Sequence, residues 1–127
     1  MALVVHGLPN CDTCRKARAW LDRFGVAHQF IDYRAVPTPA ATLQDWARRL
    51  GGWEKLVNKS GPTWRNLLPQ RKHPASDPEW LLLLREYPAL IRRPLVVRDD
   101  GGVSTGFSAA EFKRWFGQGG AISAPDP

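Results

Sequence analysis

The stretch NCDTCRK, residues 10–16, contains both cysteines of the 127-residue chain. Residues 3–6 before it form an apolar run typical of a strand, and the apolar side chains after it recur at helical spacing. The sequence therefore predicts a strand over 3–6 that leads directly into a helix over 12–24. A C-x-x-C at such a junction places Cys11 at the helix N-terminus and Cys14 about one turn further in, within reach of a disulfide.

This position favours thiolate chemistry. The unpaired amide groups and the positive end of the helix dipole stabilise a negative charge at a helix N-terminus. Arg15, Lys16 and Arg18 add positive charge nearby. We therefore predict a lowered thiol pKa for Cys11, the more accessible sulfur, and a resolving role for Cys14.

Two other readings of the cysteines compete with a redox pair. A structural zinc site needs four ligands, but the chain has no second cysteine pair and its three histidines show no ligand spacing. Both cysteines could instead be inert buried side chains, yet Cys11 falls outside the apolar face of the predicted helix. The pattern favours the redox pair, and we expect no metal.

The composition indicates one globular domain, because 127 residues with 43% hydrophobic content can bury a core without disulfides. The sequence shows no export signal and no apolar run long enough to span a membrane, so we expect a cytoplasmic protein. We also expect a monomer, although the residues carry no signal of oligomeric state. In a reducing compartment a C-x-x-C is more often catalytic, redox-sensing or metal-binding than a permanent disulfide. The net charge of +6 favours anionic partners. The sequence has no block of five or more basic residues, however, so a dedicated nucleic-acid-binding arm is not expected.

A second strand is predicted over 28–32, parallel to the first, which completes a right-handed β-α-β unit. A helical insert over about 37–87 follows. We expect its first helix to use Thr38 as N-cap and Pro39 as first residue, and a later helix to begin with Asp77 as cap. The tryptophans of the insert recur at helical spacing, which favours a packed core over a platform for stacking nucleic-acid bases.

The chain after the insert predicts a hairpin and a last helix. Strands are expected over 95–98 and 103–107, joined by an Asp-Asp-Gly-Gly turn. Ser108 and Glu111 form a capping box that opens the helix. The tail, residues 118–127, is rich in Gly, Ala and Pro and is expected to be disordered.

The order of these elements predicts an α/β fold of the thioredoxin-like plan. One mixed four-stranded sheet is built as β-α-β … β-β-α, with the helical insert between the two halves of a single domain over 1–117. In this plan Pro94 begins the third strand, where it costs no ladder hydrogen bond, and the bond before it faces the cysteine loop. The isomer of that bond cannot be read from the residues.

Four motifs then carry a family resemblance: G-x-x-N-C-x-x-C-R-K-A at 7–17, T-W-R at 63–65, I-R-R-P-L at 91–95 and G-F-S at 106–108. Up to about residue 117 the chain resembles the ArsC/Spx family of arsenate-reductase-related proteins, and within it the YffB-type ArsC-like reductases. The resemblance implies a thioredoxin-like fold and a glutathione-dependent activity. It also implies a nucleophilic Cys11, anion-binding Arg65 and Arg93, and a cis bond before Pro94.

Two departures shape the predicted function. Glutaredoxin-linked arsenate reductases of the family carry a third arginine at the position of Phe107, so a thiol or disulfide is a better expected substrate than arsenate. Such reductases generally use a single cysteine in the loop, whereas the C-x-x-C resembles the Spx-type transcriptional regulators.

The first functional hypothesis is therefore a thiol reductase without bound cofactor, with glutathione as co-substrate. Cys11 attacks the substrate, Cys14 or glutathione releases the product, and Arg93 acts with Arg65, Pro94 and Asn10 around the substrate. Guanidinium groups suit a carboxylate or oxyanion because their planar fork matches it. The alternative is a redox-switched regulator that binds RNA polymerase, and a Cys-Cys metal-transfer site ranks last.

Overall fold

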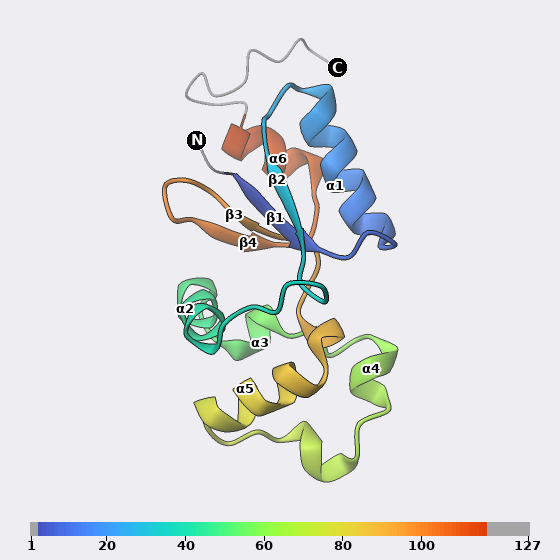
Figure 1. Cartoon of the computed structure of the whole chain (residues 1–127), viewed down its shortest axis with the longest axis vertical. Coiled ribbons are helices and arrows are strands. Elements are labelled where there is room, and N and C mark those ends of the chain that lie inside the picture. The colour runs from blue at the N-terminus through green and yellow to red at the C-terminus, as the bar shows by residue number, and fades with distance from the viewer. Residues whose placement is uncertain (1–2, 117–127) are drawn as a thin grey trace. The chain divides into compact units, whose positions relative to one another are not determined.

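A computed structural model describes residues 3–116 of the chain, which divide into two compact units (Figure 1). The first, here the sheet unit, comprises residues up to 32 and from 93 onward; the second, the helical unit, spans residues 33–92. Each unit is described in turn. The predicted disordered tail over 118–127 lies outside the described residues.

The sheet unit is built on four strands in the order β2-β1-β3-β4. They are β1 (Val4–Gly7), β2 (Gln29–Asp32), β3 (Leu95–Val97) and β4 (Val103–Thr105). β1 pairs in parallel with β2, whereas β1 with β3 and β3 with β4 are antiparallel. The predicted mixed four-stranded, thioredoxin-like sheet is thus confirmed.

The predicted strand bounds are off by one or two residues. β1 begins and ends one residue later than expected. β4 ends at Thr105 instead of residue 107, because Gly106 takes a positive φ of 83° that turns the chain away from the sheet. The amide of Gly106 donates to the carbonyl of Pro94 (2.8 Å), which fastens this turn to the start of β3.

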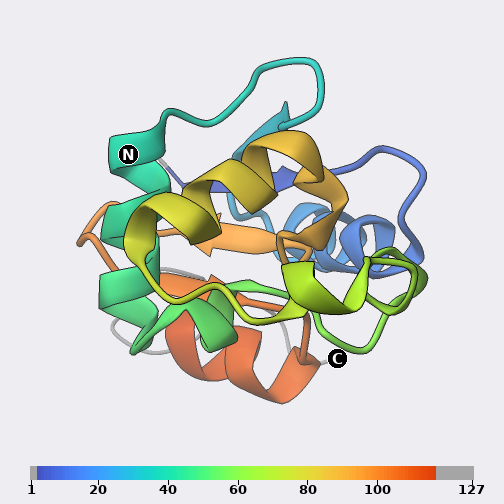
Figure 2. The same ribbon diagram turned by 90° about the horizontal axis from the view of Figure 1, so that it is seen from below.

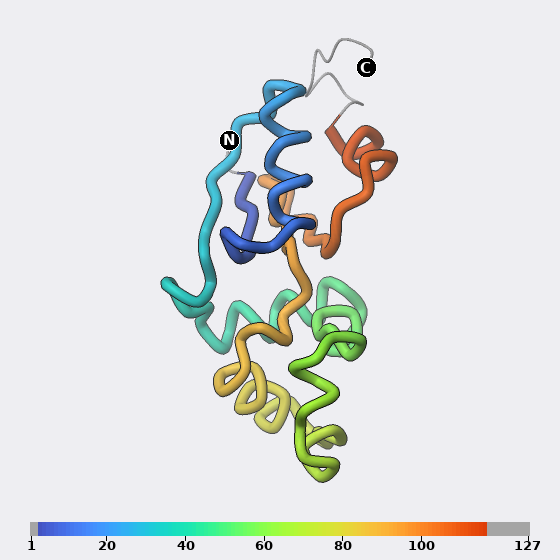
Figure 3. The backbone as a smooth tube through the Cα atoms, turned by 90° about the vertical axis from the view of Figure 1, so that its right-hand side faces the viewer, coloured from blue at the N-terminus to red at the C-terminus, as the bar shows by residue number. Residues whose placement is uncertain are grey.

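Two helices, α1 (Asp12–Arg23) and α6 (Ala109–Phe116), pack beside each other in the sheet unit (Figure 3). Both contribute to one core with side chains of the sheet, made by Leu3, Val5, Ala17, Leu21, Phe24, Val96, Phe112 and Phe116. The ring of Trp20 contacts Phe112 edge-on, with centroids 5.6 Å apart. Helix α6 starts as predicted, because the amide of Glu111 donates to the Ser108 hydroxyl (3.3 Å).

The helical unit consists of helices and short turns of 3₁₀ helix (Figure 2). Its elements are α2 (Ala40–Leu50), α3 (Trp53–Leu56), α4 (Pro62–Arg65), η1 (Pro69–Lys72), α5 (Asp77–Glu86) and η2 (Pro88–Leu90). Gly51 closes α2 in the left-handed conformation, with φ of 100°. The sequence predicts a helical insert with helices that correspond to α2 and α5, whereas α4 and η1 were not predicted.

Two predicted helix caps are wrong by one residue. Thr38 does not cap α2; Pro39, with an extended backbone (φ −60°, ψ 148°), is the N-cap and the helix begins at Ala40. Asp77 does not cap α5 either. Ser76 has the extended conformation of an N-cap and its hydroxyl accepts from the amide of Glu79 (3.4 Å), so Asp77 is already the first helical residue.

The tryptophans of the helical unit belong to its core, as predicted. Trp46, Trp64 and Trp80 are at most 9% exposed. Trp53 is half-buried and stacks on Trp80, with ring centroids 6.1 Å apart and planes inclined by 8°.

The two ends of the helical unit are fastened together. The Tyr33 hydroxyl donates to the carbonyl of Ile91 (3.1 Å), and Ile91 also forms an isolated antiparallel bridge with Val57. Tyr33 and Ile91 are both buried. In neither unit does a described helix have the length and apolar character needed to cross a membrane.

Candidate active site

Cys11 is the N-cap residue of α1, as the sequence predicts. Its backbone is extended (φ −91°, ψ 124°) while its carbonyl already accepts the first helical hydrogen bond, from the amide of Arg15 (2.9 Å). The thiol of Cys11 is half-buried, whereas Cys14, inside the first turn, is 1% exposed. The two sulfurs of the motif therefore have different environments, and both are free thiols.

The surroundings of Cys11 favour its thiolate. Partial burial raises the pKa of this thiol, but hydrogen bonds to the sulfur outweigh that effect. The donors are the amide and thiol of Cys14, the side chain of Arg93 and the amide of Thr13. The pKa of Cys11 is therefore lowered, as predicted, through the combined effect of the helix N-terminal amides and one guanidinium.

The surroundings of Cys14 have the opposite effect. Burial is the main reason why the pKa of this thiol is raised to about 11. The amide of Leu8 donates to the sulfur and lowers the pKa, but the hydrogen bond and charge of Cys11 raise it further, against a lowering by the charge of Arg93. At neutral pH Cys14 is consequently a protonated thiol that donates to Cys11.

Arg93 and Pro94 lie beside the cysteines at the start of β3. The Arg93–Pro94 peptide bond is cis, as the family resemblance implies. Pro94 is fully buried, whereas Arg93 is half-buried and its guanidinium hydrogen-bonds to the Cys11 sulfur. The structure thus brings together Cys11, Cys14 and Arg93; a substrate contact at Pro94 stays a prediction.

The other two predicted site residues, Asn10 and Arg65, lie at exposed positions. Asn10 is exposed, and its carbonyl accepts from the Arg15 guanidinium (3.1 Å). Arg65 is exposed on α4 of the helical unit, where its guanidinium donates to the carbonyl of Ser60 (2.6 Å). The convergence of Arg65 on Cys11 stays a prediction, because the two residues belong to different units.

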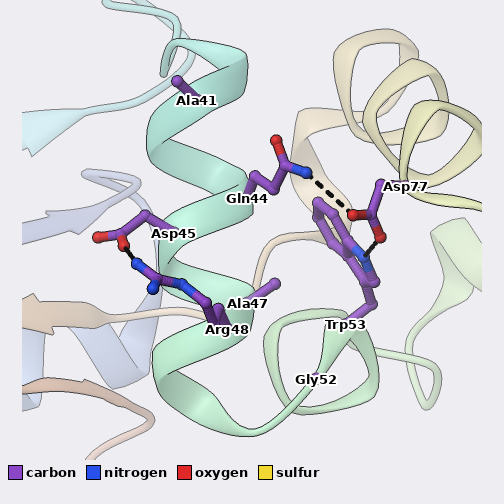
Figure 4. A pocket seen from close by; sticks show the side chains of 8 residues that line it. All are labelled: Ala41, Gln44, Asp45, Ala47, Arg48, Gly52, Trp53 and Asp77. Atoms are coloured by element: carbon purple, nitrogen blue, oxygen red, sulfur yellow. Dashed lines mark hydrogen bonds and ion pairs between the residues drawn. The ribbon is translucent and has the colours of Figure 1, made fainter.

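A cavity of about 580 Å³ lies within the helical unit, among α2, α3 and the start of α5 (Figure 4). One carboxylate oxygen of Asp77 accepts from the indole N–H of Trp53 (2.8 Å), and the other accepts from the side-chain Nε2 of Gln44 (2.9 Å). These bonds lower the pKa of Asp77 and join the three helices. None of the predicted site residues lines this cavity.

Residue types alone did not predict two important groups of the site, which are the backbone amides of Leu8 and Thr13. An amide carries no sequence signal of its own, although the predicted strand-to-helix junction implied such donors collectively. No cluster of His, Cys, Asp and Glu that could hold a metal ion occurs within residues 3–116.

Comparison with known proteins places the chain in context. The model of the ArsC family matches residues 6–115. An uncharacterised protein of Haemophilus influenzae is 38% identical over 114 residues, which cover 90% of this chain and 98% of that protein. The solved structure of a YffB protein is 32% identical, with a TM-score of 0.80 over 88% of this chain and 96% of that one.

Two further relatives differ from each other in their described activity. The global transcriptional regulator Spx of Listeria innocua is 24% identical over 120 residues, covering 89% of this chain and 86% of Spx. The structure of an arsenate reductase from Vibrio cholerae is 25% identical, with a TM-score of 0.74 over 87% of this chain and 94% of that one. With its family match over most of its length, its thioredoxin-like sheet and its paired cysteines, this chain belongs to the ArsC family.

Proposed function

We propose that this protein is a thiol reductase that exchanges electrons with glutathione or a related small disulfide. The observation that carries the proposal is the lowered pKa of Cys11, which has backbone amides of α1 and the Arg93 guanidinium on its sulfur. A thiolate is the reactive form of cysteine in disulfide exchange, so this sulfur is the nucleophile.

The reaction has two exchange steps. The Cys11 thiolate attacks one sulfur of a disulfide such as oxidised glutathione, forms a mixed disulfide and releases one thiolate, which takes up a proton. Cys14 then loses its proton and attacks the Cys11 sulfur, which forms the Cys11–Cys14 disulfide and releases the second thiol. The protein dithiol loses two electrons and the substrate disulfide gains them; run in reverse with reduced glutathione, the same steps regenerate the dithiol.

The environment of Cys14 suits the second step. While Cys11 is a thiolate, its charge and its hydrogen bond raise the pKa of Cys14. Both influences of Cys11 are present only while it is a thiolate and should end in a neutral mixed disulfide. Burial, the main cause of the raised pKa, and the lowering influences of the Leu8 amide and Arg93 do not depend on that charge. Formation of the adduct thus favours deprotonation of Cys14 at the moment when it is needed.

Phe107 supports a disulfide substrate over arsenate. Its ring packs edge-on against Phe112, with centroids 4.9 Å apart, so this side chain is part of the apolar core. A third guanidinium is therefore missing at the position where the arsenate reductases of the family carry one. The Arg93 guanidinium has several N–H donors, so it can bind an anionic group of the substrate in addition to the Cys11 sulfur. We assign Arg65, Asn10 and Pro94 as further substrate contacts.

Mass spectrometry after exposure to oxidised glutathione tests this assignment. The wild type should end as an internal disulfide, Cys14→Ser should retain a glutathione adduct, and Cys11→Ser should form neither. Because thiolate chemistry depends on Cys11, that variant should also lose glutathione-dependent reduction of a model disulfide. An adduct of equal yield on Cys11→Ser, or unchanged turnover in that variant, would contradict the proposed nucleophile.

A second candidate function is favoured by the Spx relatives. In that case the cysteines act as a redox switch: the disulfide changes the affinity for RNA polymerase, and no turnover occurs. The likeness to Spx over 89% of the chain is the specific observation behind this candidate.

A further inference from the structure

Gly7, the last residue of β1, is a glycine for reasons of space. It is buried and pairs with Asp32 of β2 in the regular parallel register. Its backbone does not require glycine, since Gly7 is not among the described glycines with positive φ. A side chain would therefore be tolerated by the backbone, and what excludes it must be a neighbouring atom.

That neighbouring atom is the sulfur of Cys14. A Cβ at position 7 would lie 2.5 Å from Cys14 Sγ. The next nearest atoms are Phe30 Cε1 at 3.4 Å and Cys14 Cβ at 3.6 Å, which are close to ordinary contacts. Non-bonded heavy atoms pack best at about 3.5–4.0 Å, so only the sulfur is incompatible with a methyl group here.

The position of this sulfur matters because Cys14 has a single side-chain torsion with three staggered states. In the observed state Sγ accepts from the amide of Leu8, the residue that follows Gly7, and its proton is donated to Cys11. Rotation away from position 7 takes Sγ out of the place where these two interactions are made. The empty space at Gly7 is therefore what allows the sulfur to stay against the end of β1.

We propose that Gly7 is a positioning residue for disulfide exchange, because its missing side chain leaves room for Cys14 Sγ in the rotamer that faces Cys11 and the Leu8 amide. The proposal rests on the proposed function, in which Cys14 attacks the mixed disulfide on Cys11. It assigns to Gly7 an effect on the second exchange step, in which Cys14 is the nucleophile.

The test compares the wild type with Gly7→Ala after mixing with oxidised glutathione, following adduct and internal disulfide by rapid quenching and mass spectrometry. Because a displacement of about 1 Å at a reacting group can cost about 10²-fold in rate, release of glutathione should slow by one to two orders of magnitude. Adduct formation at Cys11 should slow far less. Equal slowing of both steps, or no slowing of release, would overturn the proposal.

A double variant separates the sulfur contact from general damage to the fold. In Gly7→Ala with Cys14→Ala, the new methyl group occupies space that the sulfur has left. The Gly7→Ala change should therefore lower the Tm clearly in the Cys14 background and only slightly in the Cys14→Ala background. The same fall in both backgrounds would show that Gly7 does not act through Cys14 Sγ, and this measurement remains valid if Gly7→Ala alone folds poorly.

The two proposals fail in different ways. If the wild type forms no adduct and no internal disulfide, the proposed reductase function is wrong, while the Tm comparison still judges the packing of Gly7 against Cys14. If the wild type reacts as expected and Gly7→Ala releases glutathione at the wild-type rate, only the role of Gly7 is wrong.

Discussion

At the scale of single residues, Arg92 and Arg93 are neighbours with different tasks. The guanidinium of Arg93 hydrogen-bonds to Cys11, whereas the Nε of Arg92 donates to the carbonyl of Val57 (3.3 Å) within the helical unit. Arg92 is exposed and Arg93 is half-buried. Arg93 is therefore the residue expected to influence the Cys11 thiolate, and Arg92 is a matched control for its substitution.

We predict that Arg93→Ala shifts the reactivity of Cys11 to higher pH. Alkylation follows the thiolate, so its rate rises with pH and levels off above the pKa. Loss of the Arg93 hydrogen bond destabilises the thiolate and raises the pKa of Cys11, so the whole profile moves to higher pH. At pH 7 the rate should fall by at least about tenfold, since a hydrogen bond to a charged group contributes about 1.5–3 kcal/mol and about 1.4 kcal/mol corresponds to a factor of ten.

The measurement is the rate of iodoacetamide labelling from about pH 5 to about pH 10, a range that brackets the ordinary cysteine pKa of about 8.5. Cys14→Ser serves as the background, so that only one thiol reacts. Arg92→Ala should leave the profile in place. A profile that moves equally in both arginine variants would indicate a general effect of positive charge, and the specific contact of Arg93 would be refuted.

Much of the site could be predicted at this scale, because its chemistry depends on side chains with strong signatures. The spacing of Cys11 and Cys14 at a strand-to-helix junction predicted the lowered pKa of Cys11, and the nucleophilic role of Cys11 stays a proposal. The amide donors of Leu8 and Thr13 could not be predicted individually, because every residue type except proline has an amide. The tight contact of Gly7 with Cys14 could not be predicted either, since it depends on a three-dimensional distance between two elements.

At the scale of elements, backbone conformation decides at which of two neighbouring residues α2 and α5 begin. Ser76 and Asp77 are both good N-cap residues, and Thr38 precedes Pro39. The sequence predicted Thr38 and Asp77, but the extended conformations of Pro39 and Ser76 place each cap differently. The existence of helices was readable from the spacing of apolar residues, whereas these boundaries depend on φ and ψ.

We predict that Ser76→Ala destabilises the protein and that Thr38→Ala does not. The Ser76 hydroxyl caps α5 by accepting from the Glu79 amide, and loss of an N-cap costs about 0.5–2 kcal/mol. No side-chain hydrogen bond caps α2, so Thr38→Ala should change the free energy of unfolding by less than about 0.5 kcal/mol. Urea unfolding measures both values, and the reverse order would show that the caps are assigned wrongly.

At the scale of the whole molecule, positive charge is concentrated in the helical unit. Ten of the 18 Lys and Arg residues but only five of the 12 Asp and Glu residues lie within 33–92. This unit therefore carries most of the net charge of +6. Residues 33–92 should therefore attract an acidic partner more strongly than the rest of the chain. This attraction weakens as salt is added, because the distance over which exposed charges interact falls to about 8 Å at about 0.15 M ionic strength.

This charge distribution sharpens the choice between reductase and regulator. We predict that the immobilised protein recovers no more RNA polymerase from a bacterial extract when it is oxidised than when it is reduced. The salt concentration should be about 0.15 M or higher, because the Debye length is then about 8 Å or less and weak attraction between surface charges is screened. Redox-dependent recovery that disappears in Cys14→Ser would instead support the regulator. Cys14→Ser is the matched control, because it cannot form the internal disulfide.

The fold as a whole was predictable because the order of strands and helices leaves few topologies open. Strand β1, helix α1 and strand β2 follow each other as a parallel unit, and the Asp-Asp-Gly-Gly turn joins β3 to β4. The cis isomer before Pro94 was implied only by the family resemblance, since an X-Pro bond of either isomer has the same sequence.

The hydrogen bond from Tyr33 to Ile91 has a consequence for modularity. It closes the helical unit at its two points of attachment, so the chain enters and leaves this unit within the reach of one tyrosine side chain. Segments with neighbouring ends are the ones that tolerate insertion or exchange in a host domain. We therefore predict that residues 33–92 can be exchanged with the matching segment of a relative without loss of the sheet unit. Such chimeras would show which properties of the protein depend on residues 33–92 and which depend on the sheet unit that carries the cysteines.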